Sequence, residues 1–261
     1  MPPDWSLPLI KREVKRETSH ANGRVFALHG LPNHVYLTAM STSPKRQLFQ
    51  LFAHVAKALA HPNRLELIEA IAQGERSVDA LAKSCSRTVS NVSHHLRILR
   101  GAGLLVSRKE GQQVIYGLAD ERVTDVVAGI RRVAELHLAG VERIIRDNFE
   151  NRDKLTPVKR DELLERVRSG EAVVLDVRPR EEYEAGHIPG AINITLDKLP
   201  KRLKQLPHDQ EIVAYCRGPY CMLAYEAIEM LRGKGFQARR LEEGFPEWKA
   251  RNLPVATGAP D

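Results

Sequence analysis

Cysteine is scarce in this sequence: 261 residues hold three thiols, Cys85, Cys216 and Cys221. A small, odd number argues against a disulfide framework and for a reducing compartment, so we expect a cytoplasmic protein. Long apolar runs are also lacking, since no stretch approaches the roughly 18 residues of a membrane span. The basic residues near the N-terminus are not followed by the apolar core of a secretory signal. The sequence therefore predicts no membrane partner.

A large excess of one charge is lacking too. The formal net charge is +7, and residues 41–150 carry a net +4 whereas residues 157–261 are neutral. With 43% apolar and 28% charged residues, the composition is that of a globular protein. The length allows two domains, each with its own core. A basic excess confined to the N-terminal half indicates a polyanion partner there.

Residues 1–44 show no sustained hydrophobic period and are expected to form a disordered tail. Two interpretations stay open for this segment: translation begins at Met1, or it begins at Met40. Its histidines, His20, His29 and His34, have no spacing typical of metal ligands. We expect neither a metal nor a cofactor.

Residues 45–148 contain short helical segments and a hairpin. Apolar spacing predicts helices over 45–60, 64–73, 77–83 and 88–101, and alternating runs at 104–109 and 113–118 predict a β-hairpin. Helix, turn, helix and hairpin is the layout of a winged helix-turn-helix. A long helix over 121–148 follows. Its apolar positions exceed what one small domain can cover, so we expect a homodimer.

The helix over 88–101 has two chemically different faces. Val89, Val92, Leu96 and Leu99 share one face and are predicted to pack inward. Hydrogen-bonding and cationic side chains suited to base edges and phosphates lie on the opposite face and in the hairpin. These candidate contacts to a double-stranded DNA operator are Ser90, Asn91, Ser93, His94, Arg97, Arg108 and Lys109, with Gln112 and Gln113 beside them. A winged helix used only for protein contact is the alternative.

Three strings in this half resemble the arsenical-resistance repressor (ArsR) family. They are Leu-Ala-His-Pro-Asn-Arg-Leu at 59–65, Ser-His-His-Leu at 93–96 and Leu-Arg-Gly-Ala-Gly-Leu at 99–104. The resemblance implies a homodimeric repressor that an inducer releases from its operator. The metal ligands of the family do not carry over, because Cys85 lacks a Cys-x-Cys partner and Asp125 and His137 have no matching ligands. Cys85 is either a buried turn residue or a redox or persulfide-accepting thiol.

After a linker at 149–156, the pattern changes to strands alternating with helices. Strands are predicted at 172–177, 212–215 and 238–241, and helices at 199–204 and 223–233. This alternation predicts an α/β domain over 157–255 whose parallel sheet is covered on both faces. Residues 256–261 are expected to form a short tail.

The most reactive stretch is the turn at 216–221. Cys216 stands between a strand and a helix, where main-chain N–H groups converge and an adjacent anion is stabilised, so a thiolate nucleophile is predicted. Residues Arg217, Gly218, Pro219, Tyr220 and Cys221 would form the anion cradle, and Gly218 would let the backbone curl. Arg217 could orient a sulfonate or face solvent. Cys221 could be inert, or it could resolve an oxidised or persulfidated Cys216.

Residues 157–255 resemble the rhodanese family in three strings: Leu-Asp-Val-Arg at 175–178, the signature at 183–194, and Gly-Phe-Pro-Glu-Trp at 244–248. The resemblance implies that Cys216 carries a persulfide loaded by thiosulfate or polysulfide. Asp176, Arg178 and His187 are predicted to brace the fold and Trp248 to lie in the core. A phosphatase is disfavoured, because Met222 stands where the longer phosphatase loop ends in arginine.

The sequence thus predicts a winged helix-turn-helix followed by an α/β rhodanese-like domain with a central parallel sheet. The functional hypothesis is a homodimeric DNA-binding repressor whose Cys216 senses or transfers sulfane sulfur. Two alternatives stay open: a sulfurtransferase that regulates its own gene, and a regulator whose rhodanese-like domain is catalytically silent and only binds a partner.

Overall fold

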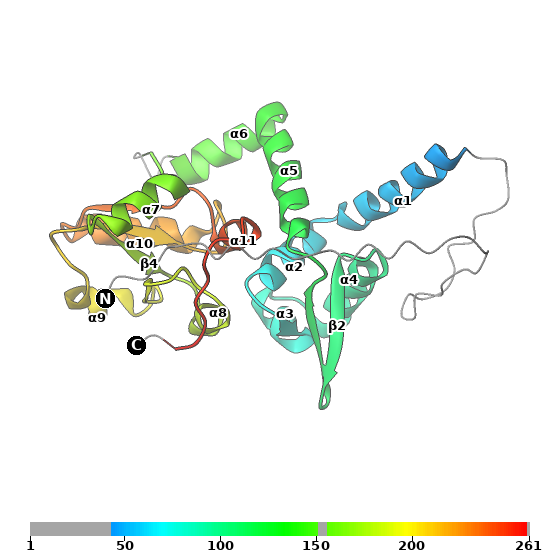
Figure 1. The fold of residues 1–261 in the computed structure, drawn as a ribbon, viewed down its shortest axis with the longest axis horizontal. Coiled ribbons are helices and arrows are strands. Elements are labelled where there is room, and N and C mark those ends of the chain that lie inside the picture. The colour runs from blue at the N-terminus through cyan, green and yellow to red at the C-terminus, as the bar shows by residue number, and fades with distance from the viewer. Residues whose placement is uncertain (1–42, 151–155, 260–261) are drawn as a thin grey trace, which may run out of the picture.

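A computed structural model describes residues 43–150 and 156–259. The two predicted domains lie side by side, with the winged helix on the right of Figure 1 and the α/β domain on the left. Nearly all of the predicted N-terminal tail, both candidate start positions and most of the linker lie outside the described residues.

The N-terminal domain has the predicted winged-helix layout. Ser77 and Thr88 each begin a helix by accepting a hydrogen bond from the main-chain N–H three residues later, at 3.2 and 3.3 Å. The elements are α1 (Pro44–Leu59), α2 (Pro62–Ala72), β1 (Arg76–Ser77), α3 (Val78–Ser84), α4 (Val89–Gly101), β2 (Leu105–Glu110) and β3 (Gln113–Leu118). Strand β3 lies between β1 and β2 in an antiparallel sheet whose hairpin is the wing in Figure 1.

The inner face of α4 is predicted correctly at three of four positions. Val92, Leu96 and Leu99 are fully buried in a core shared with α2 and α3. Val89 is 47% exposed, so its predicted inward position is wrong. It is the first residue of α4, so it lies at the end of the helix rather than in its middle.

The predicted continuous helix over 121–148 is also wrong. The chain forms α5 (Arg122–His137) and α6 (Ala139–Ile145), followed by a π-helical turn, η1 (Arg146–Glu150). The break is at Leu138, which has φ −108° and ψ 103°. Gly140, close after the break, lowers helix propensity by about 1 kcal/mol relative to alanine. The break turns α6 back toward the α/β domain, as Figure 1 shows.

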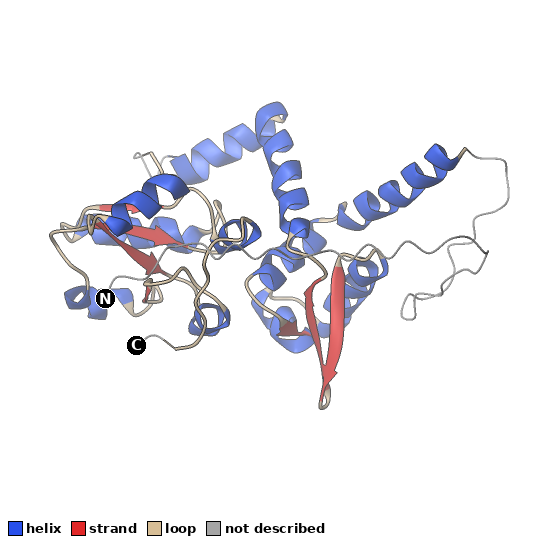
Figure 2. Ribbon diagram, in the orientation of Figure 1, coloured by secondary structure: helices blue, strands red, loops and turns tan. Residues whose placement is uncertain are grey.

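The C-terminal domain contains the predicted parallel sheet, with strand order β5-β4-β6-β7. Its strands are shown as arrows in Figure 2. They are β4 (Ala172–Asp176), β5 (Ile192–Asn193), β6 (Glu211–Tyr215) and β7 (Ala238–Arg240). The helices are α7 (Arg160–Arg168), α8 (Arg180–Ala185), α9 (Leu199–Arg202) with η2 (Leu203–Gln205), α10 (Met222–Gly233) and α11 (Phe245–Ala250).

Helices cover both faces of this sheet, as predicted. Ile212 and Ala214 of β6 join the cluster that includes α10, whereas Val213 and Tyr215 join Trp248 of α11 on the other face. Trp248 is 1% exposed, which confirms its core position. The chain remains hydrogen-bonded to the domain beyond residue 255, because the Gly258 N–H donates to the Glu184 carbonyl at 2.9 Å.

Within residues 43–150 and 156–259, no helix combines the length and the apolar character needed to span a bilayer.

Candidate functional site

The candidate thiol loop closes at the carboxyl end of β6. Cys216 directly follows this strand, and Cys221 is the N-cap residue of α10. A disulfide joins the two residues, whose Cα atoms are 6.1 Å apart. Cys216 is 2% exposed. The structure therefore holds the oxidised, closed form of the loop, and the predicted thiolate of Cys216 would belong to its reduced form.

Gly244 explains why the C-terminal signature begins with glycine. A Cβ atom at this position would lie 2.5 Å from the main-chain carbon and oxygen of Arg217 and from the Cα of Gly218. The neighbouring Phe245 N–H donates to the Cys216 carbonyl at 3.1 Å. The segment before α11 is therefore packed directly against the loop backbone, where no side chain fits.

The predicted anion cradle is only partly available in this form. The Cys221 N–H donates to the Gly218 carbonyl at 3.1 Å, so the prediction that it faces an anion is wrong for the oxidised loop. Within the described ranges, the N–H groups of Arg217, Gly218 and Tyr220 have no hydrogen-bond acceptor. Whether these three groups hold an anionic sulfur remains a prediction.

The Arg217 side chain is partly exposed and is held by a carboxylate, and whether it also orients a sulfonate remains a prediction. Its guanidinium forms a two-pronged ion pair with Glu182, with Nε–Oε2 at 3.0 Å and Nη2–Oε1 at 2.5 Å. Glu182 is 1% exposed and also pairs with Arg76 of the winged-helix domain at 2.8 Å. The hydrogen bond with Glu182 raises the pKa of Arg217. Arg217 therefore belongs to an ion cluster at the domain boundary.

Gln73, which follows α2, connects the two domains most directly. It is 1% exposed. Its Oε1 accepts a hydrogen bond from Nη1 of Arg178 at 3.1 Å, and its Nε2 donates to the Arg217 carbonyl at 3.2 Å. A buried amide with both ends satisfied fixes one relative placement of its partners. The winged-helix domain thus binds the main chain of the thiol loop.

Arg178 is in turn fixed inside the α/β domain. Its guanidinium pairs with Asp176 at 2.7 Å, and both side chains are fully buried. The Tyr215 hydroxyl donates to Asp176, and burial, followed by the Asp176 charge, raises the pKa of Tyr215 well above its usual value. His187 hydrogen-bonds the Tyr183 carbonyl at 2.8 Å. The predicted bracing roles of Asp176, Arg178 and His187 are confirmed.

A second contact from the winged-helix domain reaches the same loop through α5. The Tyr220 hydroxyl donates to Glu135, and the Tyr220 ring lies 5.2 Å from that of Phe149. Burial and this hydrogen bond raise the pKa of Tyr220. Farther along α5, Arg131 pairs with Glu247 of α11 at 2.9 Å. The loop is therefore contacted by both α2 and α5.

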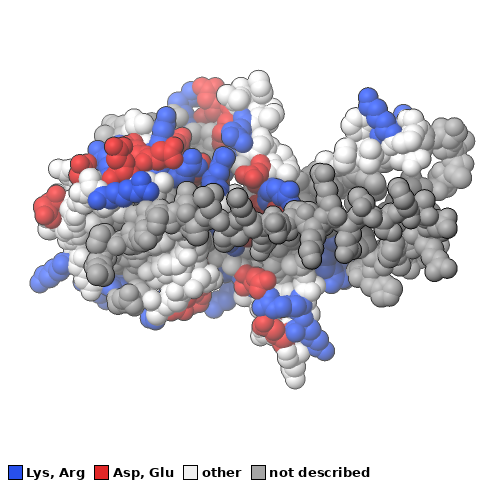
Figure 3. All heavy atoms as spheres, in the orientation of Figure 1, with Lys and Arg blue, Asp and Glu red and all other residues white. Residues whose placement is uncertain are grey.

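The predicted DNA-facing residues of α4 lie at the surface. Ser90, Asn91, His94 and Arg97 are exposed, and Ser93 is half-buried. In the wing, Lys109 is exposed, whereas Arg108 pairs with Glu75 and with Glu110. Figure 3 shows Lys and Arg mixed with Asp and Glu along this hairpin. Whether these residues contact DNA remains a prediction, and in the structure Arg108 is occupied by its two carboxylate partners.

Comparisons with known proteins match both halves. The family described as "Helix-turn-helix domain" matches residues 59–108, and "Rhodanese-like domain" matches residues 159–251. The HTH-type transcriptional regulator Rv0324 of Mycobacterium tuberculosis is 42% identical over 216 residues, which cover 83% of this chain and 95% of that protein. The chain belongs to the ArsR-type transcriptional regulators with a C-terminal rhodanese-like domain.

Two further similarities each cover part of the regulator. A tRNA sulfurtransferase of Desulfurococcus amylolyticus is 31% identical over 133 residues, 50% of this chain and 23% of that protein. The homodimeric winged helix-turn-helix DNA-binding domain of Mb0332 from Mycobacterium bovis is 35% identical, with a TM-score of 0.36, and the match covers 39% of this chain and 94% of that one.

Sequence reasoning missed a polar cluster beneath the DNA-facing surface of the regulator. His95 is 5% exposed, its Nε2 lies 3.3 Å from Nδ2 of Asn63, and its ring centre is 4.5 Å from that of His61. Burial, followed by the neighbouring His61, lowers the pKa of His95. The string at 59–65 supplies His61 and Asn63, but no signal in it pointed to His95. The cluster joins the start of α2 to α4.

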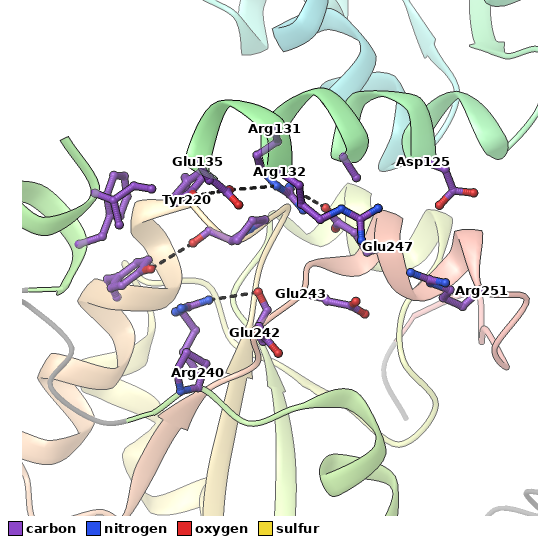
Figure 4. Close-up of a pocket in the computed structure, with 16 residues that line it drawn as sticks. Asp125, Arg131, Arg132, Glu135, Tyr220, Arg240, Glu242, Glu243, Glu247 and Arg251 are labelled. Carbon is purple, nitrogen blue, oxygen red and sulfur yellow. Dashed lines mark hydrogen bonds and ion pairs between the residues drawn. The ribbon is translucent and has the colours of Figure 1, made fainter. Parts of the chain in front are cut away.

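Two cavities flank the thiol loop of the regulator. One, of about 480 Å³, lies between α5 and the rhodanese-like domain, and Tyr220 and Pro219 belong to its wall. Figure 4 shows arginine and carboxylate side chains entering it from both domains. The other, of about 370 Å³, contains Cys221 and Arg217 at one side and Cys85 at the other. Cys85 is half-buried, so it is neither a core residue nor freely exposed.

Among the residues that the structure describes, no three or more His, Cys, Asp or Glu side chains lie close enough together to hold a metal ion.

Proposed function

We propose that this regulator is a repressor that responds to sulfane sulfur. In this proposal Cys216 is loaded by polysulfide or thiosulfate, and the loaded or oxidised loop changes the affinity of the winged helix for its DNA operator. The observation that carries the proposal is the contact of Gln73 with both Arg178 and the Arg217 carbonyl. It makes the loop conformation part of the domain interface.

The chemistry begins at Cys216. Its thiolate attacks the terminal sulfur of a polysulfide, a Cys216 persulfide forms, and the shortened polysulfide leaves with the electron pair. The Cys221 thiolate then attacks Sγ of Cys216. The bond between the two cysteines forms, the bond to the outer sulfur breaks, and hydrosulfide leaves. The disulfide in the structure is the product that this sequence of steps would leave.

Electrostatics give a reason for coupling between the loop and the DNA-binding domain. Glu69 of α2 lies against the loop, since a Cβ atom at Gly218 would be 3.4 Å from its Oε1. Loss of hydration at the interface, followed by the charge of Glu247, raises the pKa of Glu69, although the residue keeps an exposed surface. A thiolate or persulfide anion in the loop would place a second negative charge near Glu69 and weaken the docked arrangement. The neutral disulfide removes that charge, so its formation would favour docking.

The DNA contacts would come from α4 and the wing. Ser90, Asn91, Ser93, His94 and Arg97 would enter the major groove, with Arg108 and Lys109 on the adjacent backbone. Val89, exposed at the start of α4, would add an apolar contact of the kind made with a thymine methyl group. A DNA operator also places the regulator in the cytoplasm.

The active form would be a homodimer. Large apolar side chains are exposed along α1 and α5, the two helices that extend from the winged-helix core in Figure 1. They are Leu48, Phe49, Leu51 and Phe52 on α1 and Val126, Ile130, Val133 and Leu136 on α5. A monomer rarely leaves such continuous apolar faces in water, so a second copy would cover them.

Operator binding with and without sulfur tests this function. The affinity of the full chain for its operator is measured after reduction and after polysulfide treatment, for wild type and for Cys216→Ser. We expect the wild-type affinity to change by about tenfold or more, which is about 1.4 kcal/mol, and the variant not to respond. Equal wild-type affinities in both conditions would refute sensing. Equal affinities with thiosulfate–cyanide turnover would favour a sulfurtransferase, and no turnover would favour a silent domain.

A further inference from the structure

The third cysteine of the chain stands across a cleft from the thiol loop. Cys85 caps the C-terminus of α3 in the turn that leads to the recognition helix α4. The cleft that it lines, of about 370 Å³, is also lined by Cys221 and Arg217. Two of the three thiols of the protein, one from each domain, therefore open into the same space.

One face of α2 forms the floor of this cleft. At one end Glu66 pairs with Arg87, two residues after Cys85, at 3.1 Å. At the other end Gln73 binds the Arg217 carbonyl. Glu69 lies between them along the helix. Since the anchoring residues are seven positions apart, the two walls are separated by about 10 Å of helix. Because disulfide-bonded cysteines have Cα atoms about 4.4–6.8 Å apart, the two walls must move toward each other before Cys85 and Cys221 can bond.

The loop already contains a sulfur that can be exchanged. In the Cys216–Cys221 disulfide, Cys216 is almost fully buried, whereas Cys221 is half-buried and lines the cleft. An attacking thiolate needs access to only one of the two sulfurs. From the cleft, that sulfur is Cys221.

We propose that Cys85 accepts the disulfide from the loop and forms an interdomain bond with Cys221. In this step the Cys85 thiolate attacks Sγ of Cys221. The Cys85–Cys221 bond forms, the Cys216–Cys221 bond breaks, and the electron pair goes to Cys216, which takes up the proton that Cys85 has lost. Cys85 is oxidised to the disulfide level and Cys216 is reduced to the thiol, so the exchange needs no external oxidant or reductant.

The exchange has two consequences. It links the turn before α4 covalently to the rhodanese-like domain, so the position of the recognition helix depends on the chemistry of the loop. It also returns Cys216 to the thiol form, ready for another sulfane donor. The inference rests on the proposed function only for the origin of the first disulfide, which other oxidants can also make.

Peptide mapping of the full chain tests the exchange, because cleavage after Lys and Arg separates the three thiols. Cys85 falls in peptide 84–87, Cys216 in 205–217 and Cys221 in 218–232. Reduced protein is treated with polysulfide in one arm and with the thiol oxidant diamide in the other, quenched with acid, alkylated and digested without reductant. Masses of the undigested monomer and dimer distinguish bonds within a chain from bonds between chains.

We expect the linked pair 84–87/218–232 within one chain in both arms. In Cys216→Ser, the yield of this pair in the polysulfide arm should fall at least tenfold. A thiol moved just outside the cleft, by Lys83→Cys in a Cys85→Ser background, is the matched control and should not form the link. Melting temperature and oligomeric state confirm that each variant is folded.

The outcomes separate the two proposals. A linked pair in the diamide arm alone, with no added sulfur on peptide 205–217 in the polysulfide arm, would sustain the exchange and refute sulfur loading. Sulfur loading or a 205–217/218–232 link, without the 84–87/218–232 pair in either arm, would overturn the exchange and leave the proposed function standing. Links found only between chains, or equally with the control thiol at position 83, would also overturn it.

Discussion

Replacing Gln73 with leucine should uncouple the thiol loop from the winged-helix domain. Leucine matches the volume of the buried side chain but cannot bind Arg178 or the Arg217 carbonyl. A net hydrogen bond to a charged group contributes about 1.5–3 kcal/mol and one between neutral groups about 0.5–1.5 kcal/mol. Losing both hydrogen bonds should weaken docking of the two domains by about 2–4 kcal/mol. The ion pair between Arg178 and Asp176 remains and limits the loss. The ratio of docked to undocked molecules should fall roughly 30- to 800-fold.

Hydrogen exchange of the loop amides measures this change. In Gln73→Leu, peptides covering residues 216–221 and the Phe245 N–H should exchange faster, whereas the core of α4 should keep its protection. Gln73→Glu separates the two contacts, because a carboxylate still accepts a hydrogen bond from Arg178 but cannot donate one to the Arg217 carbonyl. It should therefore loosen the loop while preserving the Arg178 contact.

Gln237→Leu is the matched control, since Gln237 is exposed just before β7. It should leave the exchange rates unchanged. Unaltered loop exchange in Gln73→Leu would refute the reasoning. The reasoning would also be refuted if polysulfide changed the operator affinity of this variant by the full wild-type amount although its loop was loosened.

Three further changes test other parts of the structure. Arg97→Ala should weaken operator binding across sequences and flatten the salt dependence by about one unit, as seen in titrations at several salt concentrations. Gly244→Ala should destabilise the rhodanese-like domain by about 1–3 kcal/mol in denaturant unfolding, because the new methyl group collides with the loop backbone. For His95, the lowered pKa means that the unfolded chain binds a proton near pH 6.5 that the folded chain does not, so stability is lost as the pH falls through that value. His95→Gln should reduce the resulting drop in melting temperature between about pH 7.5 and about pH 5.5.

Each of these changes has a matched control. Arg251→Ala alters an exposed arginine of the rhodanese-like domain and should not change the salt slope. Gly233→Ala adds a methyl group that meets nothing within 4 Å and should shift stability by no more than about 1 kcal/mol. His94→Gln alters an exposed neighbour of His95 and should keep the acid dependence. A control that behaved like its test variant would contradict the mechanism assigned to that residue.

Local periodicity predicted most of the fold. Short apolar runs placed β4, β6 and β7, and helical spacing placed α3 and α4, because these signals depend on residues close together in the chain. The break at Leu138 escaped prediction for the opposite reason. Helical spacing continues through 121–148, whereas the segment beyond the break packs on residues distant in sequence, with Phe149 of η1 against Tyr220 and Tyr225.

The place of Cys216 between a strand and a helix was predicted, but the contacts around it were not. Cys216 is recognisable from its place between a strand and a helix. Gln73 is not recognisable, because a glutamine just after a helix is usually exposed to solvent. Its partners are 105 and 144 residues away in sequence. For Arg217 the sequence left open whether the side chain orients a sulfonate or faces solvent, and it gave no sign of the ion pair with the buried Glu182.

The domains meet at the loop through a main-chain atom. Gln73 recognises the carbonyl oxygen of residue 217, and every amino acid carries this oxygen at the same position. This hydrogen bond can therefore persist when the side chain at residue 217 changes, provided that the backbone conformation stays the same. Related regulators could change the loop side chains to suit a different sulfur donor while keeping the hydrogen bond between Gln73 and the loop backbone.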